Sequence, residues 1–248
     1  MNESLLISSQ GRLRRLTLNR PDKRNALDVA LCRSLLDAVR DAASDRAVGA
    51  ILLDAEGKDF CSGMDLSEAL EADLDVMLAL HQELFSIGAG LRKPMVSAVQ
   101  GAALAGGLGL ALNAHIVVAS AGARFGLTEV RVGLWPYIVF PVVAAAVGAR
   151  KATELALTAR IVDAEEACRI GIVDVVVKPG ALHERAERIA LDLAAASATA
   201  IEQGLSFVHQ IAGLDPAAAA KLAQRFRREA HASEDFRKGV LGFRRRSG

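Results

Sequence analysis

Two short stretches that combine glycine with small residues could do chemistry through the backbone alone. FCSGMDL (60–66) and GAALAGG (101–107) each follow a short apolar run. Small residues at such a turn leave backbone N–H groups uncovered, and the start of a following helix adds a positive partial charge. Two such turns that converge could bind one developing oxyanion. Each turn also fits a plainer role, in which glycine only lets a strand and a helix pack closely.

The carboxylate of Glu129, in the segment GLTEV (126–130), is the candidate for proton transfer. Its neighbours along the chain are apolar, namely Phe125, Leu127, Val130, Leu134 and Trp135. Burial among such residues would raise the pKa of the carboxyl group toward the range that suits proton transfer. The alternative is a solvated glutamate in a loop, because glutamates are mostly exposed.

Other kinds of chemistry find less support. GAALAGG lacks the G-x-G-x-x-G spacing of a dinucleotide-binding turn. The three cysteines form neither a disulfide framework nor a metal-ligand spacing, and no metal spacing connects His81, His183, His209 and His231. His115 opens an expected strand, where a lone histidine is more often structural than catalytic. We expect neither a metal ion nor a separate cofactor.

Alternating strands and helices are predicted to position these candidates. Strands are expected at 13–19, 48–53, 96–99, 114–119 and 172–177. Helices are expected after Asp28, over 66–91, over most of 138–159, and from Leu182 onward with a break at 213–216. This order predicts an α/β fold with parallel strands, in which residues 1–190 form the core and residues 191–248 a helical region.

Composition narrows the possible partners. The 248 residues are 52% hydrophobic, which suffices for a large core. Lys and Arg number 30 against 29 Asp and Glu, so the net charge indicates no nucleic-acid partner. No apolar run reaches membrane-spanning length and the first residues lack a signal-like apolar segment, so we expect no membrane partner and a cytoplasmic location.

Five segments, in this order, make the chain resemble the enoyl-CoA hydratase/isomerase family, the crotonase superfamily. They are LNRPDKRNALD (18–28), DFCSGMDLSE (59–68), KPMVSAVQGAALAGGLGLALNAHIVVAS (93–120), ARFGLTEVRVGLWP (123–136) and GARKATELALTARIVDAEEACRIGIVDVVV (148–177). The resemblance implies a crotonase-like spiral of ββα units with a C-terminal helical trimerisation region. It also implies an acyl-CoA thioester substrate, with coenzyme A as part of that substrate, and a homotrimer or a dimer of trimers.

The resemblance also implies roles for particular residues. The backbone N–H groups of Met64 and Gly106 would form an oxyanion hole for a thioester enolate, and Glu129 would be the acid–base group. Loss of one such donor typically costs about 3 kcal/mol of barrier. Residues implied to bind the substrate or its coenzyme A are Lys23, Arg24, Ala26, Ser62, Gly63, Asp65, Leu66, Gly107, Trp135 and Tyr137. For Lys23 and Arg24 the role is phosphate contact, with a solvated surface as the alternative, and Asp65 has helix capping as its alternative.

Two positions depart from the family pattern. Hydratases of the family carry a first glutamate two residues after the paired glycines, and this chain has Gly109 there. Bulky apolar residues follow Pro136, where the family often has a glycine-rich run, and this predicts a reshaped acyl pocket. Tyr137 would form part of the pocket wall, or supply a hydroxyl group in place of the missing acid.

A single carboxylate can shuttle one proton between the α and γ carbons, which is how isomerases of the superfamily are understood to work. Water addition instead needs one group to activate the water and another to protonate the α-carbon. The sequence therefore favours an enoyl-CoA isomerase-like reaction. The alternatives are a 2-enoyl-CoA hydratase that uses Glu129 with an unidentified or absent second acid, and a catalytically weak homologue that binds acyl-CoA.

Overall fold

The computed structural model describes residues 3–246, except for the side chains of 244–246. Its main sheet has six strands in the order β1 (Leu5–Gln10), β2 (Leu13–Leu18), β3 (Ala50–Ala55), β4 (Met95–Val99), β6 (Ile116–Ser120) and β9 (Val175–Val177). β1 and β2 form an antiparallel hairpin, and every later pairing in this sheet is parallel. All residues of β3 and β4 are buried, as expected for central parallel strands covered on both faces.

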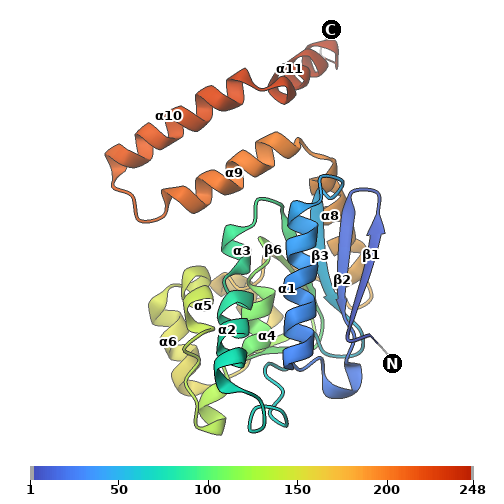
Figure 1. The fold of residues 1–248 in the computed structure, drawn as a ribbon, viewed down its shortest axis with the longest axis vertical. Helices are drawn as coiled ribbons and strands as arrows, with labels where there is room; N and C mark the ends of the chain where they lie inside the picture. The colour runs from blue at the N-terminus through green and yellow to red at the C-terminus, as the bar shows by residue number, and fades with distance from the viewer. Residues whose placement is uncertain (1–2, 247–248) are drawn as a thin grey trace.

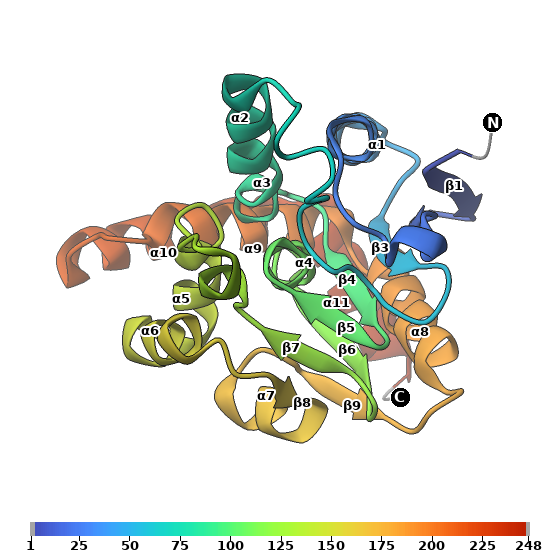
Figure 2. The ribbon, with the colours of Figure 1, turned by 90° about the horizontal axis from the view of Figure 1, so that it is seen from below.

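A second, small sheet lies beside the main one (Figure 2). Its strands are β5 (Ala102–Leu104), β7 (Arg124–Gly126) and β8 (Val162–Asp163). β5 pairs parallel with β7, and β7 pairs antiparallel with β8. A parallel bridge between Cys61 and Ala103 brings the first glycine turn against β5. The two turns, about forty residues apart in the chain, are therefore neighbours in space.

Helices cover both faces of the main sheet. α1 (Val29–Ser44), α2 (Leu74–Leu84), α3 (Ile87–Gly90) and α4 (Gly106–Ala111) lie on one side, and α8 (Leu182–Ala195) packs on β3, β4 and β6 from the other (Figures 1 and 2). The two sides form separate hydrophobic clusters. α8 crosses the division expected at residue 190, and its Ala190 and Ala194 are buried against the sheet.

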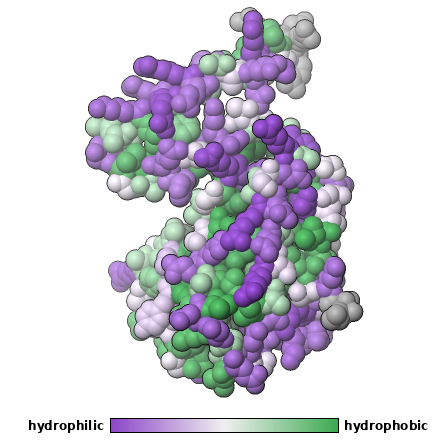
Figure 3. Space-filling view, viewed as in Figure 1, coloured by the Kyte–Doolittle hydropathy of each residue, from purple (hydrophilic) through white to green (hydrophobic). Residues whose placement is uncertain are grey.

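The remaining helices flank the small sheet or leave the core. α5 (Phe140–Val147), α6 (Ala149–Thr158) and α7 (Ala164–Ile170) lie beside β7 and β8, and two 3₁₀ turns span Pro21–Lys23 and Glu129–Val132. α9 (Ala198–Ile211), α10 (Pro216–Ala232) and α11 (Glu234–Arg246) form an arm, which a hollow separates from the core along much of its length (Figures 1 and 3). Neither α9 nor α10 contains a fully buried residue.

Within residues 3–246, no helix is long and apolar enough to cross a membrane.

The predicted α/β class is confirmed, and the five expected strands correspond to β2, β3, β4, β6 and β9. The expected helix over 66–91 is wrong at its start, because residues 66–73 form turns and α2 begins only at Leu74. Asp73 sets that boundary, since its carboxylate accepts hydrogen bonds from the N–H groups of Asp75 and Val76. The short strands β5 and β8 and the edge strand β1 were not predicted.

Candidate active site

A parallel bridge to Leu27 orients the backbone of Met64. The Leu27 N–H donates to the Gly63 carbonyl at 2.8 Å, and the Leu27 carbonyl accepts from the Asp65 N–H at 2.9 Å. In a parallel pairing of this kind, the partner residue between those two contacts turns its own N–H to the other side. The N–H of Met64 is thus directed away from Leu27 and remains available to a ligand.

Gly106 supplies the second donor at the first position of α4, where a backbone N–H has no partner within the helix. Its orientation follows from Ala105, which has φ 51° and ψ −122°. A positive φ in a residue other than glycine costs about 1–3 kcal/mol and needs support from its surroundings. Part of that support comes from the Ala105 N–H, which donates to the Gly126 carbonyl at 2.8 Å.

The two turns touch one another. A Cβ atom on Gly63 would lie 2.9 Å from the Cβ of Ala105 and 3.2 Å from the backbone nitrogen of Gly106. Gly63 also has φ 94°, so both space and backbone conformation require glycine. This close approach brings the backbone N–H groups of Met64 and Gly106 to the floor of the same cavity.

That cavity has a volume of about 230 Å³ and lies beyond the carboxyl ends of β3 and β4, where α/β sheets commonly bind ligands. One wall is the inner face of α2, another is the segment 129–139, and the floor carries the two turns. Its lining is mostly apolar, and the residues are Leu27, Met64, Leu74, Met77, Leu78, His81, Phe85, Ala105, Gly106, Glu129, Leu134, Trp135, Pro136, Tyr137, Ile138 and Val139.

Glu129 is half-buried at the start of the 3₁₀ turn Glu129–Val132 and reaches this cavity. Its Oε2 atom is buried and has no hydrogen-bond partner among the described residues. Burial raises the pKa of the carboxyl group above its usual value, and this effect outweighs the backbone hydrogen bonds of Glu129 and Thr128, which favour the charged form. A carboxylate in this state accepts and returns a proton more readily than an ion-paired one.

Gly109 faces a closed surface. A Cβ atom built on it would lie 2.8 Å from Cγ1 of Val139 and 3.1 Å from Cδ1 of Phe85. The same Phe85 ring covers Gly106, where an added Cβ would be 3.0 Å from Cζ. The place that a glutamate side chain would occupy is thus filled by an aromatic ring and a valine methyl group.

His81 was missed as a site residue, because its place on α2 could not be seen from metal spacing. It is 8% exposed and lines the cavity together with Glu129. The usable signal was helical spacing, since Met77, His81 and Phe85 recur every four residues on one face of α2.

Of the residues expected to bind substrate, Trp135 and Tyr137 line the cavity, as do Met64, Gly106 and Glu129. The others lie outside its lining, namely Lys23, Arg24, Ala26, Ser62, Gly63, Asp65, Leu66 and Gly107. Gly107 packs against the Cys61 carbonyl, where a Cβ would lie at 2.1 Å. Arg24 forms an ion pair with Asp59 at 2.8 Å, while Lys23 is exposed.

A buried polar network packs against the first glycine turn, FCSGMDL (60–66). Asn25 donates to the carbonyls of Glu56 and Asp59 at 2.9 and 2.8 Å and accepts from the Arg20 N–H at 2.7 Å. The Arg20 guanidinium lies 3.0 Å from both Asp28 and Asp65. Asp65 also accepts from the Ser67 hydroxyl, and these contacts lower the pKa of its carboxyl group. These contacts hold Asp65 within the first turn.

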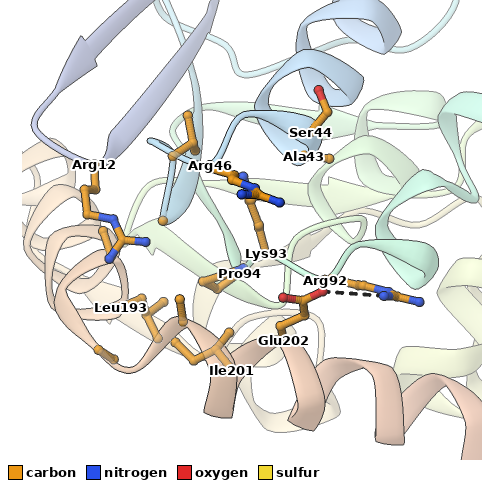
Figure 4. Close-up of a pocket in the computed structure, with 15 residues that line it drawn as sticks. Arg12, Ala43, Ser44, Arg46, Arg92, Lys93, Pro94, Leu193, Ile201 and Glu202 are labelled. Carbon is orange, nitrogen blue, oxygen red and sulfur yellow. Dashed lines mark hydrogen bonds and ion pairs between the residues drawn. The ribbon is translucent and has the colours of Figure 1, made fainter. Parts of the chain in front are cut away.

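A second cavity, of about 370 Å³, lies at the amino ends of β3 and β4 and has a cationic lining (Figure 4). Lys93 donates to the carbonyls of Ala42, at 2.8 Å, and Asp45, and so stabilises the C-terminal end of α1. Arg92 pairs with Glu202 at 3.4 Å. These cations serve the structure around them, and this cavity contains neither glycine turn. Among the residues that the structure describes, no group of acidic, histidine or cysteine side chains could hold a metal ion.

The sequence model of the family "Enoyl-CoA hydratase/isomerase" matches residues 9–247. This chain belongs to the enoyl-CoA hydratase/isomerase family. It is 38% identical over 243 residues to a probable enoyl-CoA hydratase of Rhizobium meliloti, covering 97% of this chain and 95% of that protein. It is 33% identical over 208 residues to the 2,3-dehydroadipyl-CoA hydratase of Escherichia coli, covering 83% of this chain and 82% of that protein.

Solved structures of family members have the same fold. The crystal structure of an enoyl-CoA hydratase of Mycobacterium smegmatis superposes with a TM-score of 0.93 at 29% identity, covering 99% of this chain and 97% of that one. Human enoyl Coenzyme A hydratase domain-containing protein 3 gives a TM-score of 0.93 at 27% identity, with 98% of each chain covered. The predicted crotonase fold is thereby confirmed, and the chain is an acyl-CoA enzyme of the hydratase/isomerase family.

Proposed function

We propose that this enzyme moves the double bond of a 3-enoyl-CoA into conjugation with the thioester, with Glu129 as the proton shuttle. The observation that carries this proposal is the closed surface over Gly109, where Phe85 and Val139 occupy the place of a second carboxylate. Glu129 is the one carboxylate among the residues that line the cavity. A 1,3-proton shift needs only one such group, because the same carboxyl group takes the proton and returns it.

The reaction follows from three contacts. The thioester oxygen would accept hydrogen bonds from the N–H groups of Met64 and Gly106, and the carboxylate of Glu129 would remove a proton from C2. The negative charge then moves onto the thioester oxygen, where preorganised donors stabilise it. Glu129 returns the proton at C4, and the product is the 2-enoyl-CoA. The raised pKa of Glu129 supports both halves, because it brings the basicity of the carboxylate closer to that of the enolate.

Substitution of Glu129 by Gln tests this role directly. The enzyme is incubated with a 3-enoyl-CoA, and the absorbance of the conjugated thioester is followed. We expect turnover by the unmodified enzyme and a loss of about 100- to 10,000-fold in E129Q, the range typical of a removed general acid–base group. Coenzyme A binding should persist in the variant. Equal rates in the two proteins would refute the role of Glu129.

Hydration of a 2-enoyl-CoA is the second candidate, because the Rhizobium and Escherichia relatives are named hydratases. The same incubation with a 2-enoyl-CoA measures it as a loss of conjugated absorbance. A protein that binds acyl-CoA tightly but turns over neither substrate would be the catalytically weak homologue.

The helical arm supports a proposal about assembly. α9 and α10 bury no residue completely, and apolar side chains along the arm are exposed, including Val208, Leu214, Phe236, Val240 and Leu241. We propose that the arm packs between copies of this chain in a homotrimer or a dimer of trimers. Light scattering coupled to size-exclusion chromatography measures the mass, and a monomer at micromolar concentration would overturn the proposal.

A further inference from the structure

His81 is a titratable side chain in the cavity that the shuttle mechanism does not use. It lies on the inner face of α2 and is 8% exposed. Its ring packs against that of Phe85, one helical turn later, with the ring centroids 5.7 Å apart. Its imidazole makes no hydrogen bond with the described part of the chain. A ligand in the cavity is therefore free to use its nitrogens.

The position of His81 relative to the reacting region follows from Phe85. The ring of Phe85 covers both Gly106, which carries an oxyanion donor, and Gly109, where hydratases would carry their first glutamate. His81 is the next residue on the same face of α2, so its imidazole lies beside the surface that closes over Gly109. Glu129 lines the same cavity from the opposite segment, 129–139. An acyl chain bound in this cavity of about 230 Å³ would lie between the two walls.

We propose that His81 is a second proton-transfer group in this site, and that with Glu129 it adds water to a 2-enoyl-CoA. The proposal rests on the proposed function, because it uses the same oxyanion donors and the same carboxyl group. It extends that function, since the product of the isomerisation is the substrate of the hydration. The imidazole of His81 on α2 would thus supply the second proton-transfer group, which Gly109 cannot supply because it has no side chain.

In the proposed hydration, water adds across the C2–C3 double bond of the 2-enoyl-CoA. The water oxygen forms a bond to C3 while an imidazole nitrogen of His81 accepts one proton of the water. The electron pair of the C2–C3 double bond moves onto the thioester, whose oxygen is held by the N–H groups of Met64 and Gly106. The protonated carboxyl group of Glu129 then gives its proton to C2. Imidazolium and carboxylate remain, and transfer of one proton from the first to the second restores the starting state.

The surroundings of His81 and Glu129 favour His81 as the base and Glu129 as the acid. Burial lowers the pKa of His81 and raises that of Glu129, so the two values approach one another. The form with a neutral imidazole and a protonated carboxyl group therefore becomes more populated than for two exposed groups. The third titratable side chain in the lining is Tyr137. On the outer side of α2, Glu83 is ion-paired with Arg40 of α1, and burial alone accounts for the shift of the pKa of His81.

The experiment measures both reactions in three proteins: the unmodified enzyme, H81Q and H183Q. Gln keeps a hydrogen-bonding group at position 81 but does not titrate. His183 is the matched control, because it lies on α8, on the other side of the main sheet, 3.5 Å from Asp54. Isomerisation of a 3-enoyl-CoA and hydration of a 2-enoyl-CoA are followed by absorbance over a range of pH, and thermal unfolding checks each variant.

We expect H81Q to lower the kcat of hydration by about 100-fold or more with KM little changed, and to lower the isomerisation rate far less than the hydration rate. The bell-shaped pH profile of hydration should lose the limb that belongs to His81. H183Q should leave both reactions unchanged.

Other results overturn the proposal. Equal losses of both reactions in H81Q would mean that His81 only shapes the cavity, and unchanged hydration would remove it from the chemistry. If the unmodified enzyme catalyses isomerisation but no hydration, this proposal is refuted and the proposed function stands. If the unmodified enzyme catalyses neither reaction, both are refuted. If H81Q does not fold, the unmodified enzyme still decides, because a hydration profile with a single ionisation contradicts a two-group mechanism.

Discussion

Replacement of Gly109 by Ala tests whether the surface over that residue is closed. The added Cβ would lie 2.8 Å from Cγ1 of Val139 and 3.1 Å from Cδ1 of Phe85. Val139 is 6% exposed and its β-branched side chain has little rotational freedom, so it cannot move aside easily. Overpacking of this kind costs about 1–3 kcal/mol of the free energy of unfolding.

Helix propensity acts in the opposite direction. Ala is more favourable than Gly inside a helix by about 1 kcal/mol, so an open position would be stabilised by that amount. Taking the middle of the overpacking range, we expect G109A to be destabilised by about 1 kcal/mol. With Val139 replaced by Ala, the closer of the two contacts disappears, and the Gly109→Ala change should then stabilise the protein. The coupling between the two positions is about 1–2 kcal/mol, in the range found for residues in contact.

Urea unfolding of the four proteins in this cycle measures the coupling. Gly204, in the middle of α9, is the matched control, because an added Cβ there meets no atom within 4 Å. We expect G204A to be stabilised by about 1 kcal/mol. If G109A is stabilised as much as G204A, the position is open, and the argument that Phe85 and Val139 take the place of a second glutamate is refuted.

Three further predictions concern the same site. The pKa of Glu129 is raised in the folded protein, so its carboxyl group favours folding below its unfolded pKa and loses that contribution as the pH rises through the folded pKa. The stability of E129Q relative to the parent should therefore increase from pH 4 to pH 8. Urea unfolding at both pH values measures this difference, and a constant difference contradicts the prediction. N25A removes three hydrogen bonds from a fully buried side chain and should lower the free energy of unfolding by about 3 kcal/mol, whereas a loss below about 1 kcal/mol would show that the network is dispensable. G106A places a Cβ 3.0 Å from Cζ of Phe85, beside the N–H that we propose holds the thioester oxygen. We expect kcat/KM for a 3-enoyl-CoA to fall about 100-fold with an unchanged circular dichroism spectrum. An unaltered rate would mean that this N–H does not hold the thioester.

Much of the fold was predictable because its signals are local. Short apolar runs bounded by glycine or charge indicated five of the six strands in the main sheet, and strand–helix alternation indicated parallel pairing. β5 and β8 are only three and two residues long, too short for periodicity to reveal. The start of α2 was misplaced because residues 66–73 have helical composition, while the Asp73 cap acts only at the next residue.

For the candidate site, too, the residues with local signals were predicted from the sequence and the long-range contacts were not. Gly63, Gly106 and Glu129 were readable in sequence, since turn chemistry and the order of motifs both depend on residues close together in the chain. The pairing of the two turns depends on bridges such as Cys61–Ala103, which only the folded sheet creates.

The sequence by itself determined the family, the presence of a carboxylate at Glu129 and the lack of one at Gly109, and it predicted Met64 and Gly106 as backbone donors. What occupies the space over Gly109 was decided by tertiary packing. Phe85 and Val139 lie 24 and 30 residues from Gly109 in opposite directions along the chain, so no local pattern relates them. Phe85, the C-cap residue of α2, packs over Gly106 and Gly109, and His81, one helical turn earlier, lines the same cavity as Glu129.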